Sequence, residues 1–150
     1  MNVAPSYAVI LPFLHLWMPA TTEDVLKDNQ YVQVEVTVSA RTMKAGESGE
    51  LRIAFTPAAG IHVNTTPAVE FRIDSSSAFV MKGKPTQERD AITGFLSTTA
   101  PVRQLFGIAE GTGSGLHALR GTVVYYYCSD SEGWCMRFRQ RVELPITITD

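Results

Sequence analysis

Cys128 and Cys135 are the only cysteines of the chain and its clearest candidates for chemistry. They flank a short polar loop that contains Gly133. A run of β-branched and aromatic residues precedes the loop and a long alternating run follows it, a pattern typical of a β-hairpin. Because residues that flank such a loop face each other across the two strands, the sulfurs can come within bonding distance. The residues leave three interpretations open: a redox-active pair, a structural disulfide, and two buried free thiols.

The strand after the loop predicts the direction in which Cys135 points. One parity is apolar, with Gln140 as the only polar residue in its register, and comprises Met136, Phe138, Val142, Leu144, Ile146 and Ile148. The other parity comprises Cys135, Arg137, Arg139, Arg141 and Glu143. Since side chains alternate along a strand, we expect the first set to face the core and Cys135 to face solvent among the arginines.

This placement bears on the reactivity of the thiols. If Cys128 opposes Cys135, Tyr126 lies opposite Arg137 on the same face, as a cation–π pair. A nearby positive charge favours the thiolate, which is the reacting form of cysteine. The acidic side chains of the intervening loop oppose this effect and leave the net shift open. The arginines equally fit an ordinary solvent-exposed strand face.

Composition limits the classes of protein and partner. The chain has 150 residues, enough for one domain with a substantial core, and its 45% hydrophobic and 19% charged residues indicate a globular protein. A net charge of −2 argues against nucleic acid or an anionic membrane as the main partner. His15, His62 and His117 have no metal-ligand spacing with the cysteines, so we expect neither a metal nor another cofactor.

The N-terminal segment predicts export. Residues 8–20 are strongly apolar, long enough for the core of a signal peptide and too short to span a membrane. We therefore expect an export signal or N-terminal extension over residues 1–28 and a folded domain over residues 29–150. An ordered N-terminal strand and a wrongly assigned start are the alternatives, and any helix in residues 22–28 is expected to be short.

The rest of the chain reads as short strands separated by turns. Alternation of apolar and polar residues predicts strands over 31–39, 50–56, 61–64, 68–74, 78–81, 102–110 and 116–128. Strands at this spacing, with no convincing long helix, indicate an all-β sandwich. Residues 82–101 break the rhythm as a polar loop whose only large apolar side chains are Phe95 and Leu96. The loop either folds over the cysteine hairpin and shields it or is an ordinary long connection.

Three stretches resemble the N-terminal periplasmic domain of the thiol:disulfide interchange protein DsbD family. They are GLHALRGTVVYYYCSDSEGWC at 115–135, the following strand RVELPITI at 141–148, and GELRIAFTPAAGIHVN at 49–64. The resemblance covers roughly residues 30–148 and implies an immunoglobulin-like antiparallel β-sandwich. It also implies that a loop caps the site, for which Glu88, Asp90 and Phe95 are positional candidates. Met136 and Arg137 stand where the family often has prolines.

The resemblance implies a thiol:disulfide oxidoreductase in the periplasm. In that family two cysteines, at positions that match Cys128 and Cys135, form a reversible disulfide. They take electrons from a membrane donor and pass them to periplasmic thioredoxin-like acceptors through mixed disulfides. The arginine face favours Cys135 as the less hindered sulfur, and Tyr126, Arg137 and Phe95 would form its environment. If the chain is complete, the donor is a separate protein.

Two functions of another kind remain open from the residues. One is a non-catalytic immunoglobulin-like protein-binding module with a structural disulfide, because a bridge across so short a loop would stabilise the fold by about 2–3 kcal/mol. The other is a ligand-binding sandwich that uses the loop of residues 82–101.

Overall fold

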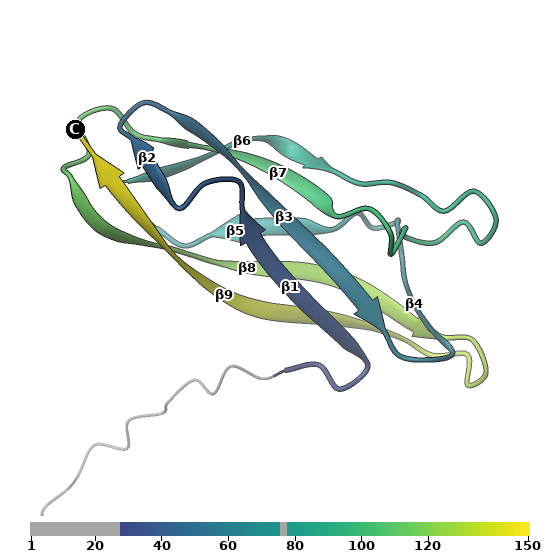
Figure 1. The fold of residues 1–150 in the computed structure, drawn as a ribbon. Helices are drawn as coiled ribbons and strands as arrows, with labels where there is room; N and C mark the ends of the chain where they lie inside the picture. Colours follow the sequence, from purple (N-terminus) through teal and green to yellow (C-terminus); the bar gives the residue numbers. More distant parts are fainter. Residues whose placement is uncertain (1–27, 76–77) are drawn as a thin grey trace, which may run out of the picture.

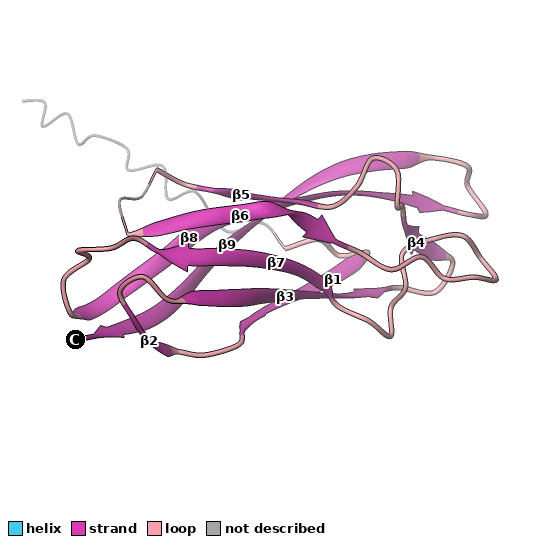
Figure 2. Cartoon of the chain, turned by 90° about the horizontal axis from the view of Figure 1, so that it is seen from above, coloured by secondary structure: helices cyan, strands magenta, loops and turns pink. Residues whose placement is uncertain are grey.

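The computed structural model describes residues 28–75 and 78–150, which form nine strands in two sheets packed face to face (Figures 1 and 2). The four-stranded sheet has the order β1 (Val32–Val38), β3 (Ser48–Pro57), β7 (Val102–Ile108), β6 (Phe79–Thr86). The five-stranded sheet has the order β2 (Thr42–Lys44), β9 (Cys135–Thr149), β8 (Gly115–Ser129), β4 (Ile61–Val63), and β5 (Glu70–Ile73) also pairs with β8. All pairings are antiparallel except β2 with β9. The predicted all-β, immunoglobulin-like sandwich is confirmed.

The alternating patterns place the core between the sheets. Leu51, Ile53 and Phe55 of β3 are buried and point at Tyr125 and Ile146 of the other sheet's strands, all in one core cluster. The rings of Phe55 and Tyr125 meet edge to face, 5.1 Å apart. Each fully buried side chain of this size contributes about 1.5–3 kcal/mol through loss of apolar surface to water. This burial fixes which face of each strand is the outer one.

Strands β8 and β9 form the long hairpin that the cysteine spacing predicts. Their register runs without interruption from Gly115 opposite Ile148 to Cys128 opposite Cys135. The other edge of β8 pairs with β5 and then with β4. The end of the hairpin is therefore held on both sides of β8, and the loop between the cysteines closes in a tight turn where Gly133 has a φ of 68°.

The structure differs from the sequence prediction at two elements. Strand β2 was not predicted, because three residues are too few to show a period; it pairs in parallel with the end of β9 and buries Met43. Strand β6 continues to Thr86 into the predicted loop, through an irregularity in its pairing with β7 after Lys82. Pro85 and Gly83, which signal a loop in the sequence, are tolerated at this irregular edge strand.

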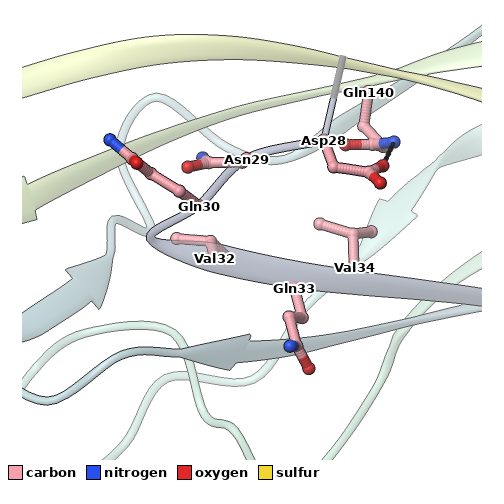
Figure 3. Close-up of a pocket in the computed structure, with 7 residues that line it drawn as sticks. All are labelled: Asp28, Asn29, Gln30, Val32, Gln33, Val34 and Gln140. Atoms are coloured by element: carbon pink, nitrogen blue, oxygen red, sulfur yellow. Dashed lines mark hydrogen bonds between the residues drawn. The ribbon is translucent and has the colours of Figure 1, made fainter. Parts of the chain in front are cut away.

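The described chain begins against the core. Asn29 is buried, and its Nδ2 donates a hydrogen bond to the hydroxyl of Tyr125 at 2.9 Å. Burial raises the pKa of Tyr125 to about 12. Gln140, the polar residue in the core register of β9, donates to Asp28 at 3.3 Å beside a shallow surface cavity of about 360 Å³ (Figure 3). The predicted export signal and short helix fall on residues 1–27, outside the described residues.

Removing the Asn29 amide tests this anchor. Asn29→Ala leaves the buried Tyr125 hydroxyl without its partner, so we expect the free energy of unfolding to fall by about 1–3 kcal/mol in urea denaturation. Tyr125→Phe in the same background removes the orphaned hydroxyl, so the double variant should lose less than the sum of the two single losses. Strict additivity of the two losses would contradict the hydrogen bond.

Candidate functional site

A disulfide joins Cys128 and Cys135 at the end of the β8–β9 hairpin. Their Cα atoms are 4.1 Å apart, as opposed residues of an antiparallel pair. Of the three interpretations of the cysteines, two buried free thiols is therefore wrong, and the described chain contains no free cysteine.

The disulfide lies on the outer face of the five-stranded sheet. Tyr127 and Tyr125 point into the core, so Cys128 and Tyr126 point away from it. Across the strands, Cys128 is opposite His62 of β4 on one side and Cys135 on the other. Residues opposite each other share a face, so these three side chains form one row. We call it the disulfide row.

A second row lies beside the disulfide row. Tyr126 is opposite Arg137, as predicted, and the guanidinium lies 6.0 Å from the centre of the tyrosine ring. On the other side of Tyr126, the backbone N–H of Asn64 donates to the Tyr126 carbonyl at 2.8 Å. Asn64, Tyr126 and Arg137 therefore stand two residues along from the disulfide row, on the same face. Of the predicted cationic face, Arg137 is the member next to the cysteines.

The arginines farther along β9 serve other partners. Arg141 Nη2 forms an ion pair with Asp74 Oδ2 at 2.9 Å, which ties β9 to the chain after β5. Glu143, on the same face, pairs with Arg120 of β8 at 3.0 Å. Arg120 is the main cause that lowers the pKa of Glu143, through a side-chain hydrogen bond. This part of the face thus carries two ion pairs, one at Arg141 and one at Glu143.

The two sulfur-bearing residues differ in exposure. Cys128 is only 6% exposed although it lies on the outer face, whereas Cys135 is exposed. Cys135 follows the hairpin turn on the edge away from β4, where few atoms cover it. The prediction that Cys135 is exposed to solvent is confirmed for the residue as a whole. The exposed residue of the pair is therefore Cys135.

Residues 88–97 form a small turn structure that we call the capping hairpin. Arg89 pairs with Leu96 as an isolated bridge, and the Asp90 carboxylate accepts from the backbone N–H groups of Ile92 and Thr93. These N–H groups, Thr93 first, lower the pKa of Asp90. Asp90 is therefore a turn-forming residue in this structure. Part of the predicted loop is ordered by its own hydrogen bonds.

The capping hairpin is attached next to the disulfide row. The backbone N–H of Leu96 donates to the Val63 carbonyl at 2.9 Å, which docks the hairpin on the end of β4. The Phe95 ring stacks on the His62 ring with centroids 3.4 Å apart and an angle of 11° between the planes. His62 stands directly opposite Cys128. The predicted environment residue Phe95 thus lies beside the disulfide row and touches it through His62.

His62 also faces a carboxylate. Its Nδ1 lies 2.7 Å from Asp130 Oδ1, but the ring N–H does not point at that oxygen. The contact is therefore electrostatic, an ion pair when the imidazole is protonated, and not a directed hydrogen bond. Asp130 is in turn fixed by its backbone N–H, which donates to the Gly60 carbonyl at 3.0 Å. The turn between the cysteines is thus tied to the turn before β4.

Asn64 makes a polar contact with the disulfide that the sequence analysis did not predict. Its Nδ2 donates to Cys128 Sγ at 3.3 Å. His62 and Asn64 could have been found from the sequence only if the pairing of β4 with β8 were known, because 64 residues separate Asn64 from Cys128. Long-range pairing of this kind leaves no local periodic signal.

An aromatic cluster supports the hairpin from the core side. Trp134 packs against Tyr31 at 5.3 Å and against Tyr127 at 5.8 Å. Met136, which we predicted in the core register, is 51% exposed because this end of β9 reaches the rim of the sandwich. Its Sδ accepts a contact from the Tyr127 hydroxyl at 3.7 Å. Met136 therefore lies on the predicted face of β9, opposite to that of Cys135, but at its exposed end.

A metal-binding cluster and a membrane-spanning helix are two further features that could indicate a function. Residues 28–75 and 78–150 contain no group of three or more His, Cys, Asp or Glu side chains placed to hold a metal ion. Nor do these residues form a helix that is long and apolar enough to cross a bilayer. The fold and site define a β-sandwich domain that presents a hairpin disulfide with one exposed cysteine.

Comparison with known proteins finds a similarity at the level of structure. No protein-family model matches the chain, and no curated protein matches it. The structure is similar to that of the Neisseria meningitidis DsbD N-terminal domain in the reduced form. The identity is 16%, the match covers 75% of this chain and 83% of that chain, and the TM-score is 0.36. This is the family that the hairpin sequence resembles, whereas the sandwich itself is established by the strand topology.

Replacing Phe95 tests whether the capping hairpin protects Cys128. In a Cys135→Ser background, Cys128 is the only thiol, and its alkylation rate reports its accessibility. Phe95→Ala removes an aromatic contact of about 0.5–1.5 kcal/mol, so we expect faster alkylation of Cys128. Ile92→Ala is the matched control, because Ile92 lies in the same turn but is 94% exposed. Equal rates in the two variants would contradict the protective role.

Proposed function

We propose that this domain is a periplasmic thiol–disulfide exchange protein that relays electrons through a reversible Cys128–Cys135 disulfide. The observation that carries the proposal is the unequal exposure of the two residues on the outer face of the sheet. A disulfide that only stabilises a fold needs no exposed sulfur, whereas exchange requires a thiolate from another molecule to reach one.

The exchange step uses Cys135 as the entry point. A partner thiolate attacks Cys135 Sγ, the bond between the two cysteines breaks, and Cys128 Sγ leaves as a thiolate with the electron pair of that bond. A second thiolate of the same partner then attacks the partner's sulfur in the mixed disulfide and releases Cys135 as a thiolate. The partner is oxidised to a disulfide and the domain is reduced by two electrons. The reverse sequence reduces an acceptor disulfide.

Strand pairings as well as the disulfide hold the hairpin together. Strands β8 and β9 are paired along their whole length below the cysteines, and β4 and β5 hold the far edge of β8. A bridge between residues seven positions apart contributes about 2–3 kcal/mol through loop closure. A domain typically has about 5–15 kcal/mol of stability, so the reduced form is expected to stay folded.

The partners follow from the chemistry of the site. A donor must present a thiolate and an acceptor a disulfide, and Cys135 is the exposed residue of the pair. The family resemblance of the hairpin sequence points to a membrane electron donor and periplasmic thioredoxin-like acceptors. The apolar segment at residues 8–20 supports export to that compartment, where disulfides persist, with the domain spanning residues 29–150. Tyr126, Arg137 and Phe95 would form the environment of the exchanging pair.

A binding module with a structural disulfide is the second candidate function. The observation in its favour is the burial of Cys128, which is typical of a stable bridge. Under this function the immunoglobulin-like sandwich binds a protein partner and the disulfide never opens. The two candidates predict different redox behaviour for the same pair.

The reduction potential separates the two functions. Folded protein is equilibrated in graded glutathione buffers, free thiols are trapped, and the masses give the fraction reduced. We expect a potential above about −300 mV and unchanged far-ultraviolet circular dichroism in the reduced form. A Cys128→Ser, Cys135→Ser double variant serves as the control for reduction without a disulfide. A potential below about −300 mV, with unfolding on reduction, would favour the binding module.

A further inference from the structure

The Asn64 side chain meets the sulfur of the buried cysteine with both ends of its amide. Nδ2 lies 3.3 Å from Cys128 Sγ and donates to it. Oδ1 lies 3.5 Å from the same sulfur, where a reduced thiol could donate in return. Among residues 28–75 and 78–150, no side-chain hydrogen bond of this kind reaches Cys135 Sγ. The amide thus distinguishes the two sulfurs.

The position of Asn64 is fixed independently of the sulfur. Its backbone N–H donates to the Tyr126 carbonyl at 2.8 Å, which continues the pairing of β4 with β8 by one residue. The next carbonyl, that of Thr65, accepts from Gln87 Nε2 at 2.8 Å. Gln87 Oε1 accepts from the Val69 N–H at 3.0 Å, so one side chain holds both ends of the segment that follows Asn64. None of these bonds involves the atoms of either cysteine.

We propose that Asn64 takes part in the exchange directly, by a hydrogen bond that stabilises Cys128 Sγ as the leaving thiolate. The inference rests on the proposed function and assigns a residue to its first step. When a partner thiolate bonds to Cys135 Sγ, the old disulfide bond breaks and its electron pair stays on Cys128 Sγ. That sulfur is buried and has lost water as a donor, so the Nδ2–H group of Asn64 supplies the hydrogen bond that the new charge needs. A thiol that is a better leaving group departs faster.

The charged groups around Cys128 interact with partners other than its sulfur. Arg137 is engaged over the Tyr126 ring in the second row, and His62 faces Asp130. On the capping hairpin, the Asp90 carboxylate accepts from its own turn and Arg89 Nε donates to the Gly94 carbonyl at 2.7 Å. Glu88 closes the base of the capping hairpin, where its carbonyl accepts from the Ser97 N–H at 2.9 Å, and Glu132 of the turn accepts from Trp134 Nε1. Asn64 is the polar side chain of the described chain that donates to the sulfur.

Ionisation of Cys128 measures the effect directly. In a Cys135→Ser background, the rate of Cys128 alkylation is followed against pH to give the pKa of the Cys128 thiol. Asn64→Ala removes the donor, so we expect the ionisation constant to fall about tenfold, as for loss of a hydrogen bond to a charged group. Asn64→Asp keeps the shape but replaces the donor with a carboxylate, so we expect a larger fall. Gln33→Glu is the matched control, since it adds the same charge at an exposed position of β1 in the other sheet.

A second measurement uses the same Asn64 and Gln33 substitutions in the protein that keeps both cysteines. Reduction of the disulfide by dithiothreitol should be slower in Asn64→Ala and Asn64→Asp than in the unsubstituted protein, and unchanged in Gln33→Glu. If both Asn64 variants leave the ionisation of Cys128 within about twofold while only the melting temperature falls, Asn64 is merely structural and the inference is wrong. A low reduction potential of the unsubstituted pair would instead overturn the proposed function, because the ionisation of Cys128 is measured without the disulfide.

Discussion

The register of the β8–β9 hairpin is the constraint on which the site depends. A strand has a side-chain period of two, so a slip by one residue would turn Cys128 to the core and Tyr127 to solvent. The core prevents this slip, because Tyr125, Tyr127 and Ile146 fill the space between the sheets. Packing of the sandwich therefore sets Cys128 opposite Cys135 on the outer face. The disulfide is a consequence of this register and makes a small contribution to holding it.

The same register brings distant residues to the sulfurs. Because β4 pairs with the end of β8, His62 joins the disulfide row and Asn64 the second row. The capping hairpin then docks on β4 and stacks Phe95 on His62. These contacts cover the β4 side of the disulfide and leave the β9 side open. The difference in exposure between Cys128 and Cys135 thus follows from their places in the strand order.

Local patterns were sufficient to predict most of this fold. Alternation over β1, β3 and β9 identified strands and their inner faces, and the cysteine spacing identified the hairpin and the pairing of Tyr126 with Arg137. Strand β2 was not predicted because its three residues are too few to show a period. Met136 lies on the predicted face but is 51% exposed, because parity predicts a face but not where the opposite sheet ends. The contacts of Asn64 and His62 depend on pairings across more than sixty positions, which no local pattern encodes.

Trapping of a mixed disulfide tests the central claim most directly, because it shows which sulfur exchanges with a partner. Cys128→Ser and Cys135→Ser variants are each mixed with a thioredoxin-like protein in its disulfide form, quenched with acid, and resolved by non-reducing electrophoresis and mass spectrometry. The account predicts rapid formation of the mixed disulfide by the Cys128→Ser variant, whose free sulfur is the exposed Cys135. Equal or faster coupling through Cys128, or no coupling by either variant, would contradict it.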